Sequence, residues 1–132
     1  MQHFIKSAHL MKIKIIIILF SLFFLQSCEF FNQIESDIEL TKKIEKKYET
    51  ENKPINLKEI TDFEWDAYTI LGPYTNVENY AKNKNLDFSN IHLNTISRSD
   101  LFLLLVFIKD NKSIKICELY KFTPISENNK LE

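Results

Sequence analysis

The sequence LFLLLVFI, residues 101–108, is an unbroken run of eight apolar residues. Polar, turn-forming residues bound it on both sides, SRSD at 97–100 and KDNK at 109–112. A run of this length and bounding is typical of a short strand that is buried on both faces of a sheet. Residues 113–122 then return with alternating apolar side chains that we expect on one face: Ile114, Ile116, Tyr120 and Phe122. The two segments predict an antiparallel hairpin at the centre of a sheet.

Residues 63–75, FEWDAYTILGPYT, predict a strand, a sharp turn and a helix in succession. The strand is expected over 65–71, where aromatic and β-branched side chains are frequent. Gly72 and Pro73 end it, because proline cannot donate to a sheet and glycine permits a tight bend. Thr75 is the expected N-cap of a helix over 76–84, with Glu78 at the capping-box position.

Residues 36–51 carry the clearest helical pattern of the chain. Ser36 is the expected N-cap, and Glu39 three residues later completes a capping box. Apolar side chains recur at steps of three and four and form one stripe: Ile34, Ile38, Thr41, Ile44 and Tyr48. We interpret the opposite, charged face as solvated; the alternative is a basic surface for anionic lipid headgroups.

Two shorter segments, residues 55–60 and 91–96, are expected to be short strands. The predicted fold class is therefore α+β: an N-terminal amphipathic helix and a short second helix packed on one face of an antiparallel sheet of about four strands. Residues 36–125 are expected to form the single small domain. The polar tail, residues 126–132, is expected to fray.

The sequence before this domain, KIKIIIILFSLFFLQSC at residues 12–28, is typical of an export signal. Lys12 and Lys14 give it a positive start, and residues 15–25 are apolar except for Ser21. This run fits the roughly 7–15 residues of a signal's apolar region and is shorter than the ~18 needed to cross a bilayer. Met11, just before the lysines, is an alternative start to Met1.

The apolar run ends in Leu25-Gln26-Ser27-Cys28, which resembles a bacterial lipobox. Gln26 departs from the small residue that is usual at its position. The resemblance implies a signal peptide over 1–27, acyl chains on Cys28, and a short tether over 28–35. The membrane is then a partner through Cys28, and the domain lies in the bacterial cell envelope, facing the periplasm or the exterior. The alternative is an uncleaved membrane helix in which Cys28 has no role.

The chain from Cys28 onward holds 14 basic and 18 acidic residues, a net charge of −4. Nucleic-acid binding needs clustered cations, so this charge argues against nucleic acid as a partner. If Cys28 is acylated, Cys117 is the remaining thiol and no intramolecular disulfide can form. We interpret Cys117 as a packed or half-exposed residue rather than a nucleophile.

No group of residues in the sequence has the pattern of a catalytic or metal site. Asp62, Glu64 and Asp66 share one side of a strand and suit a hard cation, but no ligand-spaced loop accompanies them. His92 has no recognisable partner that would make it a base. Gly72 is the single glycine of the chain, which excludes a glycine-rich phosphate loop. We therefore predict no catalytic residue, no metal, no cofactor and no small-molecule ligand.

Aromatic residues gather in and after the 63–75 segment: Phe63, Trp65, Tyr68, Tyr74 and Tyr80. We expect them in the core of a small domain. The alternative is a surface aromatic patch that binds a partner, since aromatic side chains are frequent anchors of interfaces.

The pattern F-x-W-D, an aromatic and aliphatic strand, and G-P-Y-T is similar to a signature of small uncharacterised bacterial lipoproteins. An apolar strand followed by a lysine-rich turn, as at 101–112, also matches that family. The resemblance implies no activity; it implies structural keystones in Trp65, Asp66, Gly72, Pro73 and Tyr74. We expect the Asp66 carboxylate to accept hydrogen bonds from backbone or tyrosine hydroxyl groups at the strand–turn–helix corner.

These observations predict a lipid-anchored envelope domain without enzymatic activity, which binds an envelope protein or has a structural role. One variant is an immunity-type protein that neutralises a toxin at the membrane. The alternative is a small envelope hydrolase, which the sequence disfavours because it shows no nucleophile–base pair. A deep cleft that holds two acids or His92 would favour the enzyme, and a flat aromatic or acidic patch would favour binding.

Overall fold

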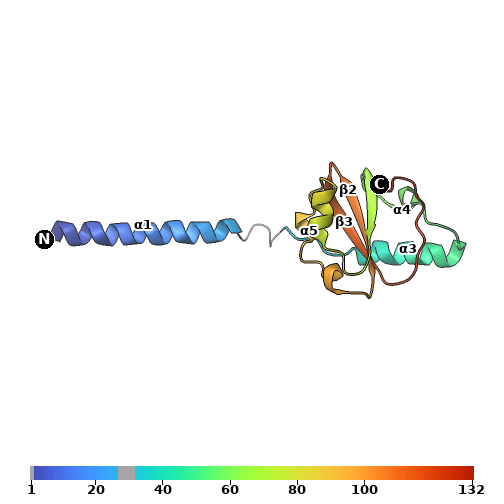
Figure 1. The fold of residues 1–132 in the computed structure, drawn as a ribbon, viewed down its shortest axis with the longest axis horizontal. Coiled ribbons are helices and arrows are strands. Elements are labelled where there is room, and N and C mark those ends of the chain that lie inside the picture. The colour runs from blue at the N-terminus through green and yellow to red at the C-terminus, as the bar shows by residue number, and fades with distance from the viewer. Residues whose placement is uncertain (1, 27–31) are drawn as a thin grey trace. The chain divides into compact units, whose positions relative to one another are not determined.

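The computed structural model describes residues 2–26 and 32–132, which fall into two compact units, Met1–Asn32 and Gln33–Glu132. The described part of the first unit is essentially one helix, α1 (Gln2–Gln26; Figure 1). Its side chains from Ile5 to Phe24 are exposed. The second unit is an α+β domain, which confirms the predicted fold class. Each unit is described by itself below.

The centre of the domain is a sheet of three antiparallel strands in the order β1-β2-β3. The strands are β1 (Ala67–Leu71), β2 (Leu103–Lys109) and β3 (Lys112–Leu119). The predicted hairpin is confirmed, since β2 pairs with β3 across the turn at Asp110 and Asn111. Both turn residues have positive φ angles, 51° and 62°, which short polar side chains tolerate best.

The sheet has three strands rather than the four we expected. In the segment 55–60, Ile55 makes a single bridge to Ile125, and Leu57–Ile60 then form the short helix α4. Asn56 caps α4 by accepting a hydrogen bond from the Lys58 N–H. The segment 91–96 holds parts of two 3₁₀ turns instead, η1 (Ser89–Ile91) and η2 (Thr95–Arg98). A short segment with alternating apolar and polar residues can bury its apolar side chains in a turn as well as in a strand. The alternation alone therefore does not identify a strand.

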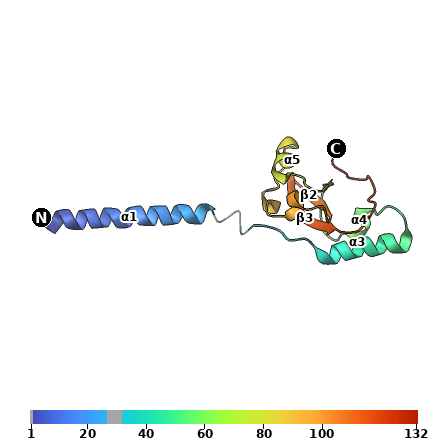
Figure 2. The ribbon, with the colours of Figure 1, turned by 60° about the horizontal axis from the view of Figure 1, so that its bottom comes forward.

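Helices cover both faces of the sheet, and the prediction of one covered face is wrong (Figures 1 and 2). Helix α5 (Val77–Asn83) packs on the face that carries Leu104, Val106 and Ile108. Helix α3 (Ile38–Glu51), with α4, packs on the face that carries Leu105 and Phe107. Strand β2 is thus buried on both faces, as its unbroken apolar sequence predicts, and each face needs its own helix.

Helices α3 and α5 both begin one residue later than the sequence suggests. Asp37, not Ser36, caps α3, and its Oδ1 accepts the Leu40 N–H at 2.9 Å. Ser36 Oγ accepts the Glu118 N–H at 2.9 Å instead. Asn76, not Thr75, caps α5 by accepting the Asn79 N–H. Adjacent residues here can all act as caps, and the tertiary contacts choose between them.

The C-terminal tail, which we expected to fray, lies along the outer edge of β1. The Tyr68 N–H donates to the Asn129 carbonyl at 3.0 Å, and the Leu131 N–H donates to the Tyr68 carbonyl at 2.8 Å. Leu131 also packs against the hydrophobic core. Covering a sheet edge in this way satisfies its backbone groups and blocks unwanted pairing. No local sequence pattern predicts this placement, since a terminal polar segment is usually mobile.

Candidate functional site

Helix α1 meets the length and composition criteria for a membrane span over Ile5–Phe24, criteria that a signal sequence near the N-terminus also meets. Lys6, Lys12 and Lys14 lie in that span, and the apolar run after Lys14, interrupted by Ser21, covers the eleven residues 15–25. Eleven helical residues extend about 16 Å, roughly half of a ~30 Å hydrocarbon core. Cys28, the expected lipid-attachment residue, lies outside the described residues.

Trp65 is a core residue with 4% of its surface exposed. Its ring meets the Phe107 ring edge-on at a centroid distance of 5.2 Å and the Tyr68 ring at 6.3 Å. Its Nε1–H donates to Thr61 Oγ1 at 2.9 Å, and the Lys58 ammonium lies 3.8 Å from the ring centroid. These contacts give Trp65 the structural role that the signature implies.

Asp66 accepts a backbone hydrogen bond, as expected, but at a different place from the one predicted. Its Oδ2 accepts the Asp110 N–H at 2.8 Å, and Asp110 is the first residue of the β2–β3 turn. The carboxylate therefore holds the distant hairpin turn against the start of β1. It does not hold the corner between β1 and α5.

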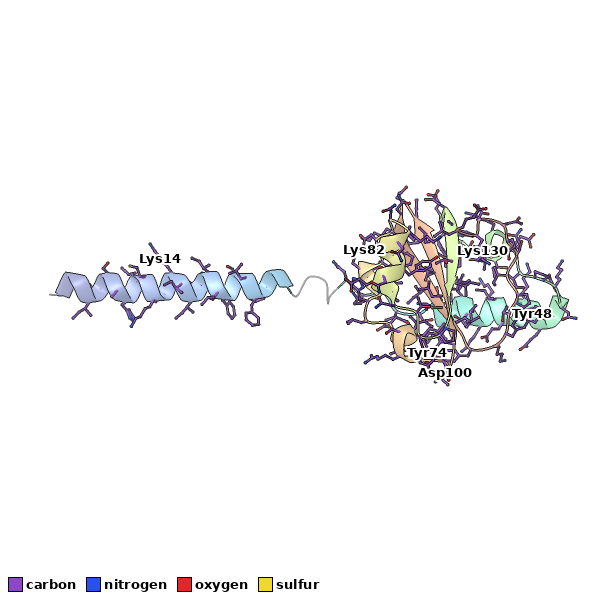
Figure 3. The ribbon with its side chains drawn as sticks, in the orientation of Figure 1. Lys14, Tyr48, Tyr74, Lys82, Asp100 and Lys130 are labelled. Carbon is purple, nitrogen blue, oxygen red and sulfur yellow. The ribbon has the colours of Figure 1, made fainter. Side chains whose placement is uncertain are left out.

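The turn at Gly72 and Pro73 owes its shape to Tyr74 rather than to the glycine. Gly72 does not have a positive φ angle and has open space where a Cβ would lie. Tyr74 has a φ of 61°, and the Thr75 N–H and Oγ1–H both donate to the Gly72 carbonyl. This is the pattern of a type II turn, with proline in its first central position. The Tyr74 side chain is 63% exposed at the surface (Figure 3), so it does not belong to the core.

The three acidic residues at 62, 64 and 66 do not form a metal site. Asp66 bonds to the hairpin turn, and Glu64 pairs with Lys109 at 2.8 Å. This lysine lowers the pKa of Glu64 through its hydrogen bond and its charge. Among the residues that the structure describes, no group of three or more potential ligands is placed to hold a metal ion.

His92 lies in a small hollow together with Ser97 and Glu78, a combination that the sequence did not suggest. All three side chains are exposed. Within the described part of the chain, none of them hydrogen-bonds to another of the three. A catalytic triad needs its nucleophile bonded to the base and the base bonded to an orienting group. The arrangement therefore lacks the contacts of a working triad.

Cys117 is fully buried in β3, and its sulfur lies 3.8 Å from the Asp37 carbonyl oxygen. Burial raises the pKa of the Cys117 thiol to about 11. A thiol with so high a pKa is protonated and unreactive at neutral pH. Cys117 is therefore a packed residue rather than a nucleophile.

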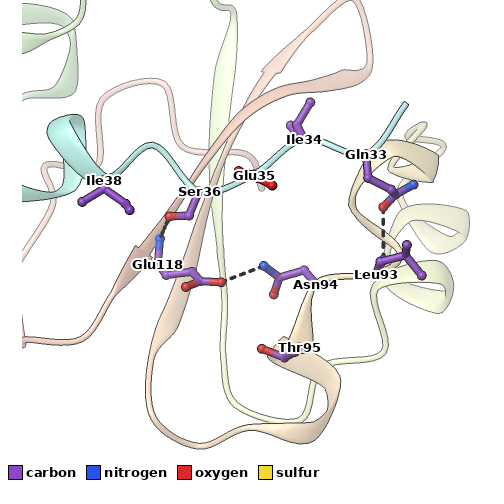
Figure 4. A pocket seen from close by; sticks show the side chains of 9 residues that line it. All are labelled: Gln33, Ile34, Glu35, Ser36, Ile38, Leu93, Asn94, Thr95 and Glu118. Atoms are coloured by element: carbon purple, nitrogen blue, oxygen red, sulfur yellow. Dashed lines mark hydrogen bonds between the residues drawn. The ribbon is translucent and has the colours of Figure 1, made fainter. Parts of the chain in front are cut away.

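Three open hollows of the domain share lining residues from one to the next, and we refer to them together as the groove. The first, of about 420 Å³, lies where the chain enters the domain (Figure 4); it is lined by Gln33, Ile34, Glu35, Ser36, Ile38, Leu93, Asn94, Thr95 and Glu118. The second, of about 330 Å³, lies between α3 and the end of β3 and adds Thr41, Lys42, Glu45, Tyr120 and Lys121. The third, of about 220 Å³, continues past Tyr120 to Pro73, Leu101 and Phe122.

Large apolar side chains that are exposed in the domain concentrate along this groove. Five of them line it: Ile38 (65% exposed), Leu93 (55%), Leu101 (71%), Tyr120 (59%) and Phe122 (80%). The remaining one in the described domain, Tyr74, directly follows the lining residue Pro73. Exposed apolar side chains that gather in one region mark an interaction site more often than scattered ones do.

The first hollow carries two negative charges and is lined by no cation of the described chain. Glu118 accepts from two neutral donors, the Asn94 amide at 3.1 Å and the Tyr120 hydroxyl at 2.8 Å. The Glu118 carboxylate in turn raises the pKa of Tyr120. Glu35 is exposed and makes no ion pair with a described residue. Neither carboxylate is therefore neutralised within the described domain.

Sequence reasoning missed this groove because it assigned the same residues to the core. Helical geometry could have indicated that Ile38 is exposed. At roughly 100° per residue, Ile38 lies about 120° around the helix from Ile44, and so on a different side. Tyr120 and Phe122 continue the alternation of β3 beyond the end of the strand. Which apolar residues stay exposed depends on neighbours that are distant in sequence.

Comparisons of the chain with protein-family models, with curated proteins and with solved structures give no match.

Proposed function

We propose that this protein is a lipid-anchored component of the bacterial cell envelope whose folded domain binds another protein without catalysis. The N-terminal segment supports this location, because it has a positively charged start, a short apolar run and a cysteine in a lipobox-like context. Two or more acyl chains on Cys28 would make membrane attachment stable. The domain would then face the periplasm or the exterior.

The observation that carries the binding function is the groove. Five exposed apolar side chains line its three connected hollows, and exposed apolar surface is costly unless a partner covers it. The groove is shallow and open, which suits a protein surface or peptide better than a small molecule. An immunity-type role, in which the domain captures a toxin at the membrane, is one form of this function.

A small envelope hydrolase is the alternative, and one observation favours it. His92, Ser97 and Glu78 line one hollow of about 160 Å³. Against it, these residues are exposed and unbonded to one another, and hydrolases hold such groups in contact. Ser97→Ala tests this alternative: hydrolysis of envelope material by the wild-type protein and its loss in the variant would replace the binding proposal.

The anchor is tested by growing cells with an alkyne-bearing fatty acid and isolating the full-length protein. We expect label on the wild-type protein and none on Cys28→Ser, which should leave the membrane fraction. Unlabelled wild-type protein that stays in the membrane would replace the lipid with an uncleaved helix.

The binding function is tested by affinity capture of the intact protein from its own envelope, followed by mass spectrometry. We expect one partner at near-stoichiometric yield, lost in Ile38→Ser and Phe122→Ser. Glu78→Gln, an exposed change outside the groove, is the control and should retain the partner. Equal recovery with all the variants would refute binding through the groove.

A further inference from the structure

The edge of β3 already accepts an extended backbone from its own chain. The Asp37 N–H donates to the Ile116 carbonyl at 2.8 Å, and Ser36 forms a parallel bridge to Ile116. The Ser113 N–H likewise donates to the Asp87 carbonyl. Residues 120–122 follow the end of β3, with a bend at Lys121, and expose Tyr120 and Phe122 to the groove.

An extended segment suits this geometry. Ser36 and Asp37 already lie against Ile116 of β3 in this way, so an extended backbone fits this side of the sheet. Peptides that add to a sheet edge gain affinity from main-chain hydrogen bonds and specificity from side-chain pockets. The second and third hollows provide such pockets beside Ile38, Tyr120 and Phe122.

The charges along the groove define where a basic residue of the partner belongs. The first hollow holds Glu35 and Glu118 and lacks a described cation. The second hollow is lined by Lys42 and Lys121 as well as Glu45 and Glu118. A partner cation is therefore favoured at the first hollow, because opposite charges attract at close range, whereas the two cations and two anions of the second hollow balance and give no such preference.

We propose that the groove binds an extended segment of a partner protein, with a lysine or arginine side chain in the first hollow and apolar side chains against Ile38, Tyr120 and Phe122. This inference rests on the proposed binding function and adds the site and the chemistry of the partner. The two carboxylates of Glu35 and Glu118 then face the cation, and the exposed side chains of Tyr120 and Phe122 contact the apolar residues of the segment.

The test uses the full-length protein in nanodiscs and synthetic heptapeptides as probes. Each fluorescent peptide alternates valine or leucine with serine. One set carries a single lysine, either at a terminal or at the central position. A matched set carries glutamate in place of that lysine. Binding is measured by anisotropy and located by NMR line broadening. We expect the terminal-lysine peptide to bind about tenfold more tightly than its glutamate counterpart, with broadening confined to the groove.

Glu35→Gln is the decisive variant, because Glu35 is exposed and unpaired within the described domain and its change should leave the fold intact. It should weaken the terminal-lysine peptide by about three- to fivefold, as for a partly exposed ion pair, and leave the glutamate peptide unweakened. Glu78→Gln is the matched control and should change neither. Phe122→Ser should weaken all the peptides that bind.

Four outcomes would overturn the inference. Equal affinity for lysine and glutamate peptides would remove the charge assignment. Protection of the groove by nanodisc lipid alone would make it a membrane-contact surface, and concentration-dependent self-association that is lost in Phe122→Ser would make it an interface between copies. Capture of a native partner that is insensitive to Glu35→Gln and Phe122→Ser would leave the proposed binding function standing and place it elsewhere on the domain.

Discussion

Replacing Trp65 tests the packing of the α3 face of the sheet. The side chain is 4% exposed, lies edge-on to Phe107 and Tyr68, and donates a hydrogen bond to Thr61. Truncating a buried tryptophan to alanine costs about 3–5 kcal/mol. A domain of this size is typically stable by about 5–15 kcal/mol, so Trp65→Ala should be severely destabilised or unfolded.

Trp65→Phe separates the ring packing from the polar contact. It keeps an aromatic body near Phe107 but removes the indole N–H that bonds to Thr61 at 2.9 Å. We expect a loss of about 1–2 kcal/mol, of which the hydrogen bond accounts for about 1 kcal/mol. The remainder reflects the smaller ring beside the Lys58 ammonium.

The assay is urea unfolding of the full-length protein followed by far-UV circular dichroism, since tryptophan fluorescence is lost in these variants. Phe122→Ser is the control and should change the free energy of unfolding by less than about 0.5 kcal/mol, because Phe122 is exposed. A loss of less than about 1 kcal/mol in Trp65→Ala, with an unchanged slope, would refute the core assignment.

Three further predictions follow from the turn, the helix cap and the thiols. Tyr74→Gly should raise the free energy of unfolding by about 0.5–1 kcal/mol in urea titrations, since Tyr74 has a φ of 61° and an exposed side chain; a loss of stability would mean that the ring packs. Asp37 accepts hydrogen bonds from Lys115 and from the Leu40 N–H, and the Lys115 contact is the larger cause of its lowered pKa. The contribution of the Asp37 carboxylate to stability is therefore present above about pH 4 and is lost as the pH falls through the lowered pKa of the folded state. Asp37→Asn should therefore lose less stability than the wild type between pH 5 and 3. Parallel plots of unfolding free energy against pH for the two proteins would contradict the ion pair. Native protein should not react with a maleimide at Cys117, and the urea-denatured protein should show one reactive thiol; two would mean that Cys28 is not acylated.

The candidate site could be predicted only in part. The structural role of Trp65 was readable, because a single tryptophan in a strand-like segment usually belongs to the core. The role of Asp66 was not, because its partner Asp110 lies 44 residues away and no local pattern joins them.

The sequence by itself determined the central hairpin and the two main helices of this domain. The apolar run at 101–108 set a strand buried on both faces, the polar turn after it set the hairpin, and helical periodicity set α3 and α5. These features follow from side chains that are close along the chain, so hydrophobic periodicity and turn chemistry are enough to specify them.

Only the tertiary structure decided which surfaces remained uncovered. It placed the helices on opposite faces of the sheet, moved the caps to Asp37 and Asn76, and laid the C-terminal tail along β1. It also left Ile38, Tyr120 and Phe122 exposed along the groove, whereas their apolar neighbours were buried. Burial depends on contacts between residues far apart in the sequence, and no local pattern carries that information.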